Sequence, residues 1–201
     1  MPLPRFEKLP TARQQAIYDA ALDELSAHGP AASVNRILAA CAVSKGALYY
    51  YFADRDDLLR SAITDRIDAF LAAMRAEVRP PQTVAAFWEE VARMVALGSA
   101  WFAARPRVLA AFARIAGLRT LSFRPRDTEQ KVLATLEGAL ATGQRLGAVR
   151  SDLPREYLLP LTLAVARASD QWLLSKAQAS ADERAAAVAQ VAETYRRLLA
   201  R

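Results

Sequence analysis

Residues 33–58 read SVNRILAACAVSKGALYYYFADRDDL, and this stretch decides the fold of the chain. Ser33, Ser44 and Asp54 recur in it at intervals of about ten residues. The side-chain oxygen of each can accept the free amide hydrogens in the first turn of a helix. The spacing therefore predicts three N-caps, two short helices and the start of a third helix. The expected bounds are 33–40 for the first short helix, 41–43 for a tight turn and 44–52 for the second helix.

The second short helix has an unusual composition, because Tyr49, Tyr50 and Tyr51 follow one another. A helix turns by about 100° per residue, so three consecutive side chains fan over most of its surface and cannot all be buried. Tyrosine hydroxyls beside Lys45 and the Ser44 cap suit contacts to phosphate and insertion into a DNA groove. The alternative is that these tyrosines are ordinary surface or partner-packing residues.

The segment SKGALYYYF, followed by DRDDLL, resembles the recognition-helix signature of the tetracycline-repressor (TetR) family of transcriptional regulators. The generic signature of that family is V-S-x-G-T-L-Y-x-Y/H-F-x-x-K-x-x-L. The matching positions are Val43, Ser44, Gly46, Leu48, Tyr49, Tyr51, Phe52, Arg55 (in place of lysine) and Leu58. The close match covers about residues 11–60. The rest of the chain matches only as a helical pattern of the right length.

The resemblance implies an all-α fold. An N-terminal three-helix helix-turn-helix DNA-binding domain would be joined to a C-terminal helical ligand-binding and dimerisation domain. The expected domains are a flexible arm over 1–10, the DNA-binding domain over 11–56 and the ligand-binding and dimerisation domain over 57–201. The arm holds Pro2, Pro4 and Pro10 and is expected to be mobile. It also carries Arg5 and Lys8 and could reach a minor groove.

Three positions depart from the family pattern. Leu38 stands where a small alanine is usual, and Ala42 stands where the turn usually has glycine. A glycine there commonly serves a positive φ, and a Cβ in that region costs on the order of 1 kcal/mol. Ala47 replaces a threonine, which removes a possible phosphate ligand and leaves a methyl-sized contact of the kind that can touch thymine. The first two departures bear on the angle between the two short helices.

The remaining sequence predicts further helices, separated by proline and glycine breaks. The first would run from Thr11 to about residue 27, with Thr11 and Gln14 as a capping box. Pro160 lies inside a later expected helix and should kink it. The other expected ranges are 55–76, 83–104, 107–118, 127–146, 154–177 and 182–200.

Composition weighs against several classes of protein. One cysteine and one histidine occur among 201 residues. A disulfide within the chain is therefore excluded. One cysteine and one histidine are also too few for a Cys/His zinc site, and they give no convincing Ser-His-Asp triad. No catalytic residue, metal or cofactor is expected, and the chain is not expected to be an enzyme. The sequence has neither an uncharged run of about 18 residues nor an apolar signal segment, so a cytoplasmic protein without a membrane partner is expected.

The net charge of +6 gives little support for DNA binding, because it lies in the wrong part of the chain. Residues 1–60 hold seven Lys and Arg and seven Asp and Glu, which gives zero. The excess, twenty minus fourteen, lies in residues 61–201. Binding must therefore depend on where particular side chains point. A sequence-independent architectural protein would need a basic head, which this count denies.

The expected DNA contacts divide into two kinds. Phosphate contacts are expected from Arg13, Ser33, Ser44, Tyr49, Tyr51 and Arg55, and base-edge contacts from Asn35, Lys45, Ala47 and Tyr50. In the C-terminal part, side chains on several helices could converge on a pocket for a small, largely apolar ligand, or they could simply be core. These residues are Trp88, Met94, Trp101, Phe102, Phe112, Arg114, Arg167 and Trp172.

The last two expected helices are rich in alanine and serine, which let helices approach closely. Two such helices from each of two copies form a four-helix bundle, and the resemblance implies the same homodimer; the alternative is that these helices pack only within one chain. The predicted function is a dimeric, sequence-specific transcriptional regulator that binds a double-stranded DNA operator. It would be a repressor, released from a palindromic operator by an unidentified small-molecule effector. The alternative is a helical small-molecule-binding protein or enzyme with a vestigial helix-turn-helix.

Overall fold

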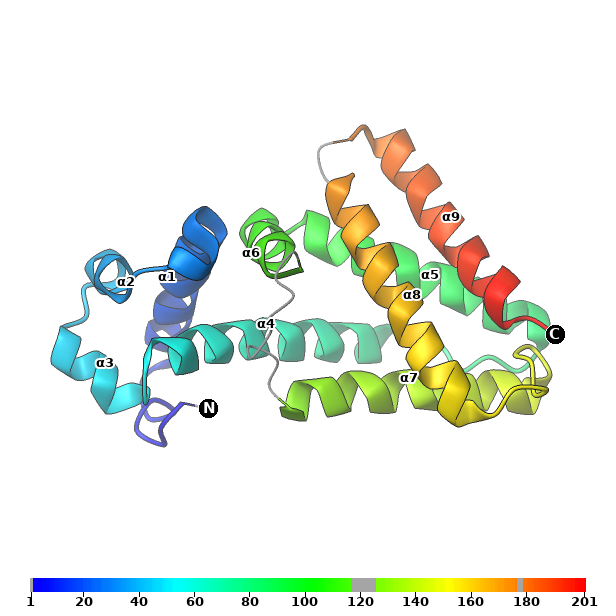
Figure 1. Ribbon diagram of the computed structural model, residues 1–201, viewed down its shortest axis with the longest axis horizontal. Coiled ribbons are helices and arrows are strands. Elements are labelled where there is room, and N and C mark those ends of the chain that lie inside the picture. The colour runs from blue at the N-terminus through cyan, green and yellow to red at the C-terminus, as the bar shows by residue number, and fades with distance from the viewer. Residues whose placement is uncertain (1, 117–125, 177–178) are drawn as a thin grey trace. The chain divides into compact units, whose positions relative to one another are not determined.

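The computed structural model describes residues 2–116, 126–176 and 179–201, without the side chains of Lys45, 113–116 and 126–129. Within these ranges the regular elements are helices, apart from an isolated bridge between Val149 and Ala200 (Figure 1). The helices are α1 (Thr11–His28), the 3-10 turn η1 (Gly29–Ala31), α2 (Val34–Cys41), α3 (Lys45–Tyr51), α4 (Arg55–Glu77), α5 (Val84–Ala103), α6 (Pro106–Ala116), α7 (Arg126–Leu146), α8 (Arg155–Ser175) and α9 (Ala181–Leu199). The predicted all-α fold is confirmed, and the helices begin and end close to their expected positions.

The chain divides into two compact units. The N-terminal unit comprises Met1–Ala69 and Arg105–Thr128, and the C-terminal unit comprises Phe70–Ala104 and Glu129–Arg201. The sequence suggested a boundary after residue 56. The division by contacts instead keeps the first part of α4, together with α6, in the same unit as the helix-turn-helix.

The core of the N-terminal unit is built around α1, which buries one face of its helix. Ile17 is 1% exposed and Ala21 is fully buried. Leu48 of α3 and Phe52, just beyond it, close this core from the side of the helix-turn-helix. From the other direction α6 contributes Ala111, and Arg107 of α6 forms an ion pair of 3.4 Å with Asp23 of α1. The helix-turn-helix is therefore fixed to a rigid scaffold.

The helix caps agree with the sequence at two positions and differ at two others. Ser44 caps α3 by accepting from the amide of Ala47 over 3.2 Å, and Asp54 caps α4 by accepting from the amide of Asp57 over 2.7 Å. The capping box expected at the start of α1 was wrong. Pro10 is the N-cap, and the Gln14 amide donates instead to the carbonyl oxygen of Leu9 over 2.8 Å.

Ser33 occupies the N-cap position of α2, but its side chain makes no capping bond. The amide of Ser33 donates to Glu24 Oε1 over 2.8 Å, and so does Arg36 Nε over 2.8 Å. Glu24 is buried, and its hydrogen bond with Arg36 holds the pKa of its carboxyl below the ordinary value. A side chain of α1 therefore fixes the start of α2, which is why the local cap is dispensable.

The C-terminal unit places α9 against α5 and α8, as Figure 1 shows in green, orange and red. Its core contains Phe87, Leu140, Val149, Leu158 and Leu199. The C-terminus is held by a backbone hydrogen bond of 2.8 Å from the amide of Arg150 to the carbonyl oxygen of Leu199. Pro160 lies inside α8 without ending it. Across the ranges that the model describes, no helix combines the length and the apolar character needed to span a membrane.

Candidate nucleic-acid interface

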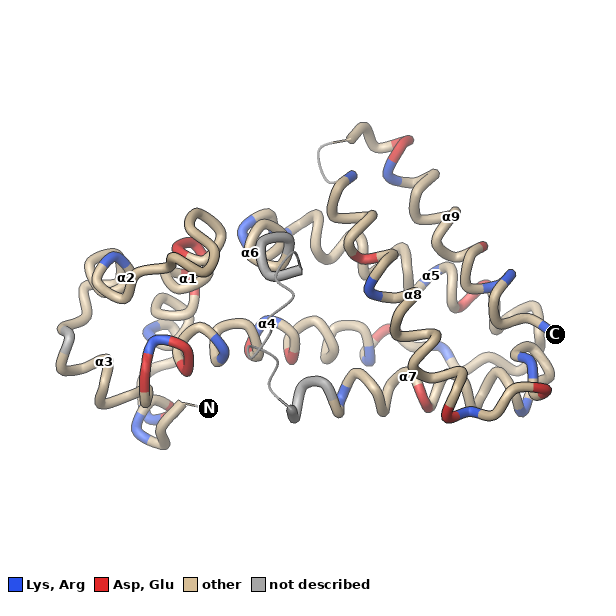
Figure 2. Tube along the Cα trace, viewed as in Figure 1, with Lys and Arg blue, Asp and Glu red and all other residues tan. Residues whose placement is uncertain are grey.

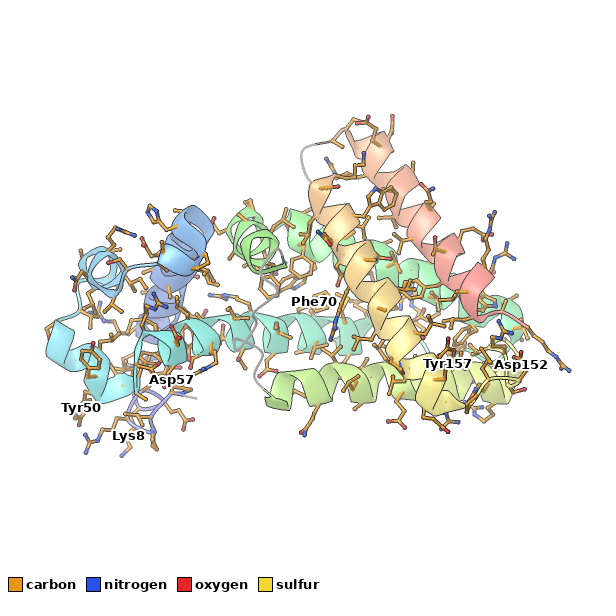
Figure 3. The ribbon with its side chains drawn as sticks, viewed as in Figure 1. Lys8, Tyr50, Asp57, Phe70, Asp152 and Tyr157 are labelled. Atoms are coloured by element: carbon orange, nitrogen blue, oxygen red, sulfur yellow. The ribbon has the colours of Figure 1, made fainter. Side chains whose placement is uncertain are left out.

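The outward face of α3 is the best-defined surface of the N-terminal unit. Leu48 and Phe52 are 1% and 0% exposed and anchor the helix to the core. Tyr49 and Tyr50 are 52% and 49% exposed, and Figure 3 shows Tyr50 at the outer edge of the unit. Because the inward side chains fix the rotation of the helix, the two tyrosines are presented on a rigid element. Rigid, exposed tyrosines on a short capped helix are suited to entering a groove.

Tyr51, the third tyrosine, has a different environment. It is half-buried, its ring centroid lies 6.0 Å from that of Phe6, and Tyr50 packs edge-on against it at 5.4 Å. Tyr51 therefore packs behind the exposed face of α3, whereas Tyr49 and Tyr50 form that face. Of the three consecutive tyrosines, two are therefore exposed, Tyr49 and Tyr50, and Tyr51 is half-buried.

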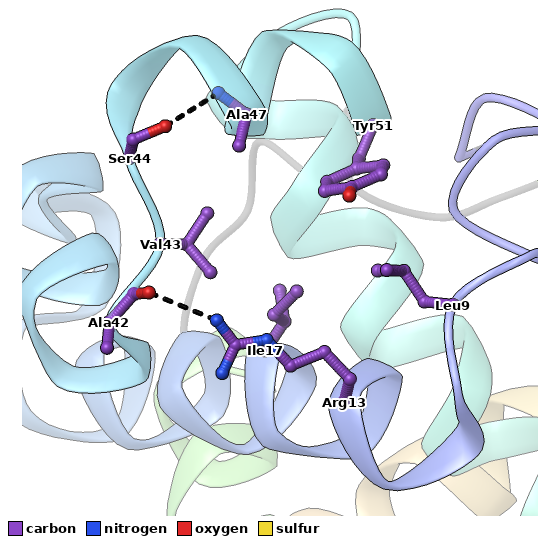
Figure 4. A pocket seen from close by; sticks show the side chains of 8 residues that line it. All are labelled: Leu9, Arg13, Ile17, Ala42, Val43, Ser44, Ala47 and Tyr51. Carbon is purple, nitrogen blue, oxygen red and sulfur yellow. Dashed lines mark hydrogen bonds between the residues drawn. The ribbon is translucent and has the colours of Figure 1, made fainter.

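A small cavity lies between α1 and the helix-turn-helix (Figure 4). Its volume is about 160 Å³. The lining residues are Leu9, Arg13, Ile17, Ala42, Val43, Ser44, Ala47 and Tyr51. Arg13 Nη2 donates to the carbonyl oxygen of Ala42 over 3.0 Å, so this arginine connects α1 to the turn between α2 and α3. Four predicted DNA-contact residues, Arg13, Ser44, Ala47 and Tyr51, are brought together here.

Arg55 stands where the family pattern has lysine, and its side chain is already bonded within the unit. Its guanidinium pairs with Asp56 at 2.9 Å. It also donates to the carbonyl oxygens of Pro30 over 3.3 Å and Ala32 over 3.4 Å. These bonds connect the start of α4 to the turn before α2 and neutralise part of the charge of the arginine. A phosphate contact by Arg55 remains a prediction.

The other predicted contacts lie on α2 and α3 or at the start of α2. Asn35 is exposed on α2, and Ser33 is half-buried at its start. Ala47 is half-buried on α3. Lys45 opens α3, but its side chain lies outside the described part of the structure. Within the described residues, no group of three or more His, Cys, Asp and Glu side chains could hold a metal ion.

Sequence reasoning missed the way in which the N-terminal arm joins this surface. Phe6 is 1% exposed and packs against Tyr18 and Phe52, with ring centroids 5.0 and 4.8 Å away. The amide of Leu3 donates to the carbonyl oxygen of Tyr51 over 2.8 Å. This docked arrangement differs from the mobile arm that the prolines suggested. The available signal was the apolar spacing of Leu3, Phe6 and Leu9, which the prolines obscured.

Residues 17–62 match the family model described as bacterial regulatory proteins of the tetR family. This range runs from the buried Ile17 of α1 through the helix-turn-helix to Ala62 in α4. Over these residues the chain is similar to the tetR family. The resemblance inferred from the recognition-helix signature is therefore confirmed, and the residues that carry it lie inside the matched range.

Solved structures of transcriptional regulators share the fold over nearly the whole chain. The transcriptional regulator FadR from Bacillus subtilis, solved with stearoyl-CoA, superposes with a TM-score of 0.74 at 19% identity, covering 89% of this chain and 95% of that one. A putative TetR-family regulator from Syntrophomonas wolfei gives 0.72 at 20% identity, covering 93% and 94%. A TetR-family regulator from Chloroflexus aurantiacus gives 0.68 at 20% identity, covering 100% and 99%. A search of curated proteins found no match.

The residues predicted to bind a ligand fall into separate groups. Trp101 and Phe102 form an aromatic cluster with Phe70, whose ring centroid lies 5.3 and 5.2 Å from theirs. Trp88 packs edge-on against Phe87 at 5.0 Å, in a different part of the C-terminal unit. The sulfur atom of Met94 lies 3.8 Å from Nη2 of Arg93.

The remaining predicted ligand residues lie on α6 and α8. Phe112 packs against the core of the N-terminal unit, so it is grouped with the helix-turn-helix. Arg167 is exposed and Trp172 half-buried, both on α8. The side chain of Arg114 lies outside the described residues. Ligand binding stays a prediction for the whole set. Trp101 and Phe102 are the two members that pack together in one aromatic cluster, with Phe70.

Asp170 on α8 adds a titratable group to the C-terminal unit. Solvent reaches part of the residue, yet the surrounding protein raises the pKa of its carboxyl to about 6. Burial also raises the pKa of Tyr195 on α9, and the charge of Asp170 adds to that shift. The charge of Asp170 on α8 therefore acts on Tyr195 of α9, across the contact between these two helices.

Proposed function

We propose that the chain is a dimeric, sequence-specific DNA-binding transcriptional regulator, a repressor that leaves a palindromic operator when a small, largely apolar ligand binds. One observation carries this proposal: Leu48 and Phe52 are buried while Tyr49 and Tyr50 are about half exposed on the same short helix. A helix anchored on one side and aromatic on the other has the form needed to read a major groove. The role requires no catalytic group.

We divide the predicted DNA contacts into contacts to phosphate and contacts to base edges. Tyr49 and Ser44 would bind phosphate oxygens, which fixes the position of the unit on the duplex. Asn35, Lys45 and Tyr50 would face base edges, which supplies sequence information. Arg13 and Tyr51 are also bonded within the unit, so we assign them to holding the reading surface in place as well as to contacting DNA.

Dimerisation would use the exposed small residues of the last two helices. Ala164 and Ala168 are exposed on α8, and Ala185 and Ala189 are exposed on α9. Alanine at helical spacing lets two helix pairs pack closely into a four-helix bundle. Two reading heads would then bind half-sites about one helical turn of DNA, or a multiple of it, apart.

The effector would bind in the C-terminal unit, where Phe70, Trp101 and Phe102 form a half-buried aromatic cluster. The similar FadR of Bacillus subtilis was solved with stearoyl-CoA, which supports a ligand with a long apolar portion. Such a ligand releases DNA only if it binds the non-binding conformer more tightly than the DNA-binding one. The released conformer would present its two heads at a spacing that no longer matches the operator.

Selection of bound duplexes from random DNA tests this proposal. A palindromic consensus would establish sequence reading, dimerism and half-site spacing in one experiment. Gel shifts on the selected duplex at fixed salt would then compare the wild type with Lys45→Ala and Tyr49→Phe, both of which should bind more weakly. Tyr157→Phe is the matched control, because Tyr157 is 56% exposed but lies on α8 (Figure 3). Wild-type affinity in both α3 variants would refute the assignment of the reading helix.

The alternative function, a ligand-binding protein or enzyme with a vestigial helix-turn-helix, makes the opposite prediction. It requires that no duplex is enriched from random DNA, even at low salt, while calorimetry detects tight binding of a small molecule. An enriched palindrome excludes it.

A further inference from the structure

The N-terminal arm docks at the C-terminal end of α3. Its residues form successive turns, with the amide of Phe6 donating to Leu3 over 2.8 Å and the amide of Leu9 donating to Phe6 over 3.0 Å. Phe6 is inserted into the core, and Leu3 bonds to the last residue of α3. Leu3 and Phe6 lie on the two sides of Arg5 in the sequence, so the backbone of Arg5 is held beside α3.

The side chain of Arg5 lies over the ring of Tyr50. Its guanidinium carbon is 4.3 Å from the ring centroid, which is the geometry of a cation–π contact. Both residues are exposed. A stacked guanidinium keeps its full positive charge and its five N–H donors, because the aromatic face accepts none of them in a conventional hydrogen bond. Arg5 is therefore positioned and still able to bind an anion.

Other arginines near the helix-turn-helix are placed differently. Arg36 pairs with Glu24 and Arg55 pairs with Asp56. In Figure 2 the arm carries basic positions next to α3, and the part of α3 after Lys45 carries none. Residues 1–60 carry no net charge, and Arg5 contributes to them an unneutralised cation beside the exposed Tyr49 and Tyr50.

We propose that Arg5 binds a DNA backbone phosphate beside the C-terminal end of α3 and that Tyr50 positions it there; this rests on the proposed function. The seven residues of α3 span about 10 Å, which is slightly less than the roughly 12 Å width of the major groove. The N-terminal residues of a recognition helix contact base edges in the groove, so we place the cation at its opposite end against the DNA backbone. Phosphate oxygens line that backbone, and guanidinium is the side chain that binds them best.

The test measures DNA affinity of the full-length protein by fluorescence anisotropy over a series of salt concentrations. The probes are the duplex selected from random DNA and an unrelated duplex of equal length. Arg5→Ala should weaken binding to both duplexes by a similar factor, about fivefold or more. It should also reduce the slope of log affinity against log salt by about 0.9 for each half-site, because one phosphate contact is lost. Arg5→Gln, which keeps a polar side chain, should show the same loss of slope.

Two further variants test the role of Tyr50. Tyr50→Phe keeps the ring, so adding Arg5→Ala to it should cost as much affinity as in the wild type. Tyr50→Leu removes the ring, so adding Arg5→Ala to it should cost clearly less. Arg145→Ala, on an exposed residue of α7, removes the same charge and should leave the slope unchanged.

Three outcomes would overturn the proposal. Wild-type affinity and slope in Arg5→Ala, with weaker binding by Lys45→Ala, would leave the proposed function standing and remove Arg5 from the interface. A loss confined to the selected duplex, with an unchanged slope, would mean that Arg5 reads a base. If the wild type enriches no duplex, the proposed function and this contact fail together.

Discussion

Arg13 and Ala42 are joined by a hydrogen bond of 3.0 Å from guanidinium to carbonyl, across 29 residues of sequence. Ala42 has φ 50 and ψ 47, which places it in the left-handed region. It is the one non-glycine residue with positive φ in the described part of the chain. The turn of the helix-turn-helix thus has a backbone that favours glycine but carries a Cβ, and α1 supplies an arginine that holds it.

Replacing Ala42 by glycine should stabilise the N-terminal unit. Removing the Cβ relieves left-handed strain of about 1–2 kcal/mol, and the greater freedom of glycine in the unfolded chain offsets part of it. We expect the free energy of unfolding in urea to rise by about 0.5–1 kcal/mol. Ala39→Gly is the matched control: Ala39 is exposed within α2, where glycine should cost about 1 kcal/mol. Equal destabilisation by both changes would contradict the strain argument.

Gly143 should not tolerate a side chain. A Cβ at this position of α7 would lie 2.3 Å from Cγ2 of Val149 and 2.7 Å from Cζ of Phe87. Gly143→Ala is therefore expected to lower the free energy of unfolding by about 1–3 kcal/mol, measured by chemical denaturation followed by circular dichroism. Gly138, also in α7, has no neighbour within 4 Å of such a Cβ. Gly138→Ala should stabilise the helix by up to about 1 kcal/mol, and a loss there would show that helix propensity does not decide the result.

Glu24 should make the N-terminal unit sensitive to acid. The pKa of its carboxyl is depressed in the folded state, first by the hydrogen bond from Arg36. Its contribution is fully present above the ordinary carboxyl pKa of 4.5 and is lost as the pH falls through the lower folded value. Glu24→Gln should lower the free energy of unfolding by about 1–3 kcal/mol near neutral pH. The variant should then lose less stability than the wild type on acidification.

Urea denaturation at a series of pH values would check this prediction. The control is Glu7→Gln, since Glu7 is exposed in the same unit. A Glu24→Gln protein whose stability falls with acid as steeply as that of the wild type would assign the acid sensitivity to other carboxylates.

Phe6 should be essential to the N-terminal unit although it belongs to the arm. It is 1% exposed and contacts the rings of Tyr18 and Phe52. Phe6→Ala is expected to cost about 3–5 kcal/mol, which a thermal melt would show as a lower transition temperature for this unit. Leu3→Ala is the control, because Leu3 is 36% exposed and should matter little. An unchanged melt for Phe6→Ala would mean that the arm does not hold the docked position.

The features that the sequence predicted well are those encoded over one or two helical turns. The caps at Ser44 and Asp54 and the inward positions of Leu48 and Phe52 depend on neighbours within four residues. The length and order of the helices follow from the same local signals, together with proline and glycine breaks.

The features that could not be predicted depend on partners far apart in the chain. Glu24 replaces the side-chain cap expected from Ser33, and Arg55 reaches back to the carbonyl of Pro30. Neither partner is indicated by spacing, because both arise only when α1, α2 and α4 pack together. The position of Arg5 over Tyr50 has the same origin, since it depends on the insertion of Phe6 into the core.

The bond between the Leu3 amide and the Tyr51 carbonyl has a practical consequence for handling the protein. An affinity tag or fluorophore attached ahead of residue 2 would emerge beside α3, where it could obstruct DNA or add charge of its own. A C-terminal attachment follows Arg201, whose neighbour Ala200 is bridged to Val149 in the other unit. Labels for binding measurements should therefore be attached at the C-terminus, and an N-terminal tag should be cleaved before affinities are compared.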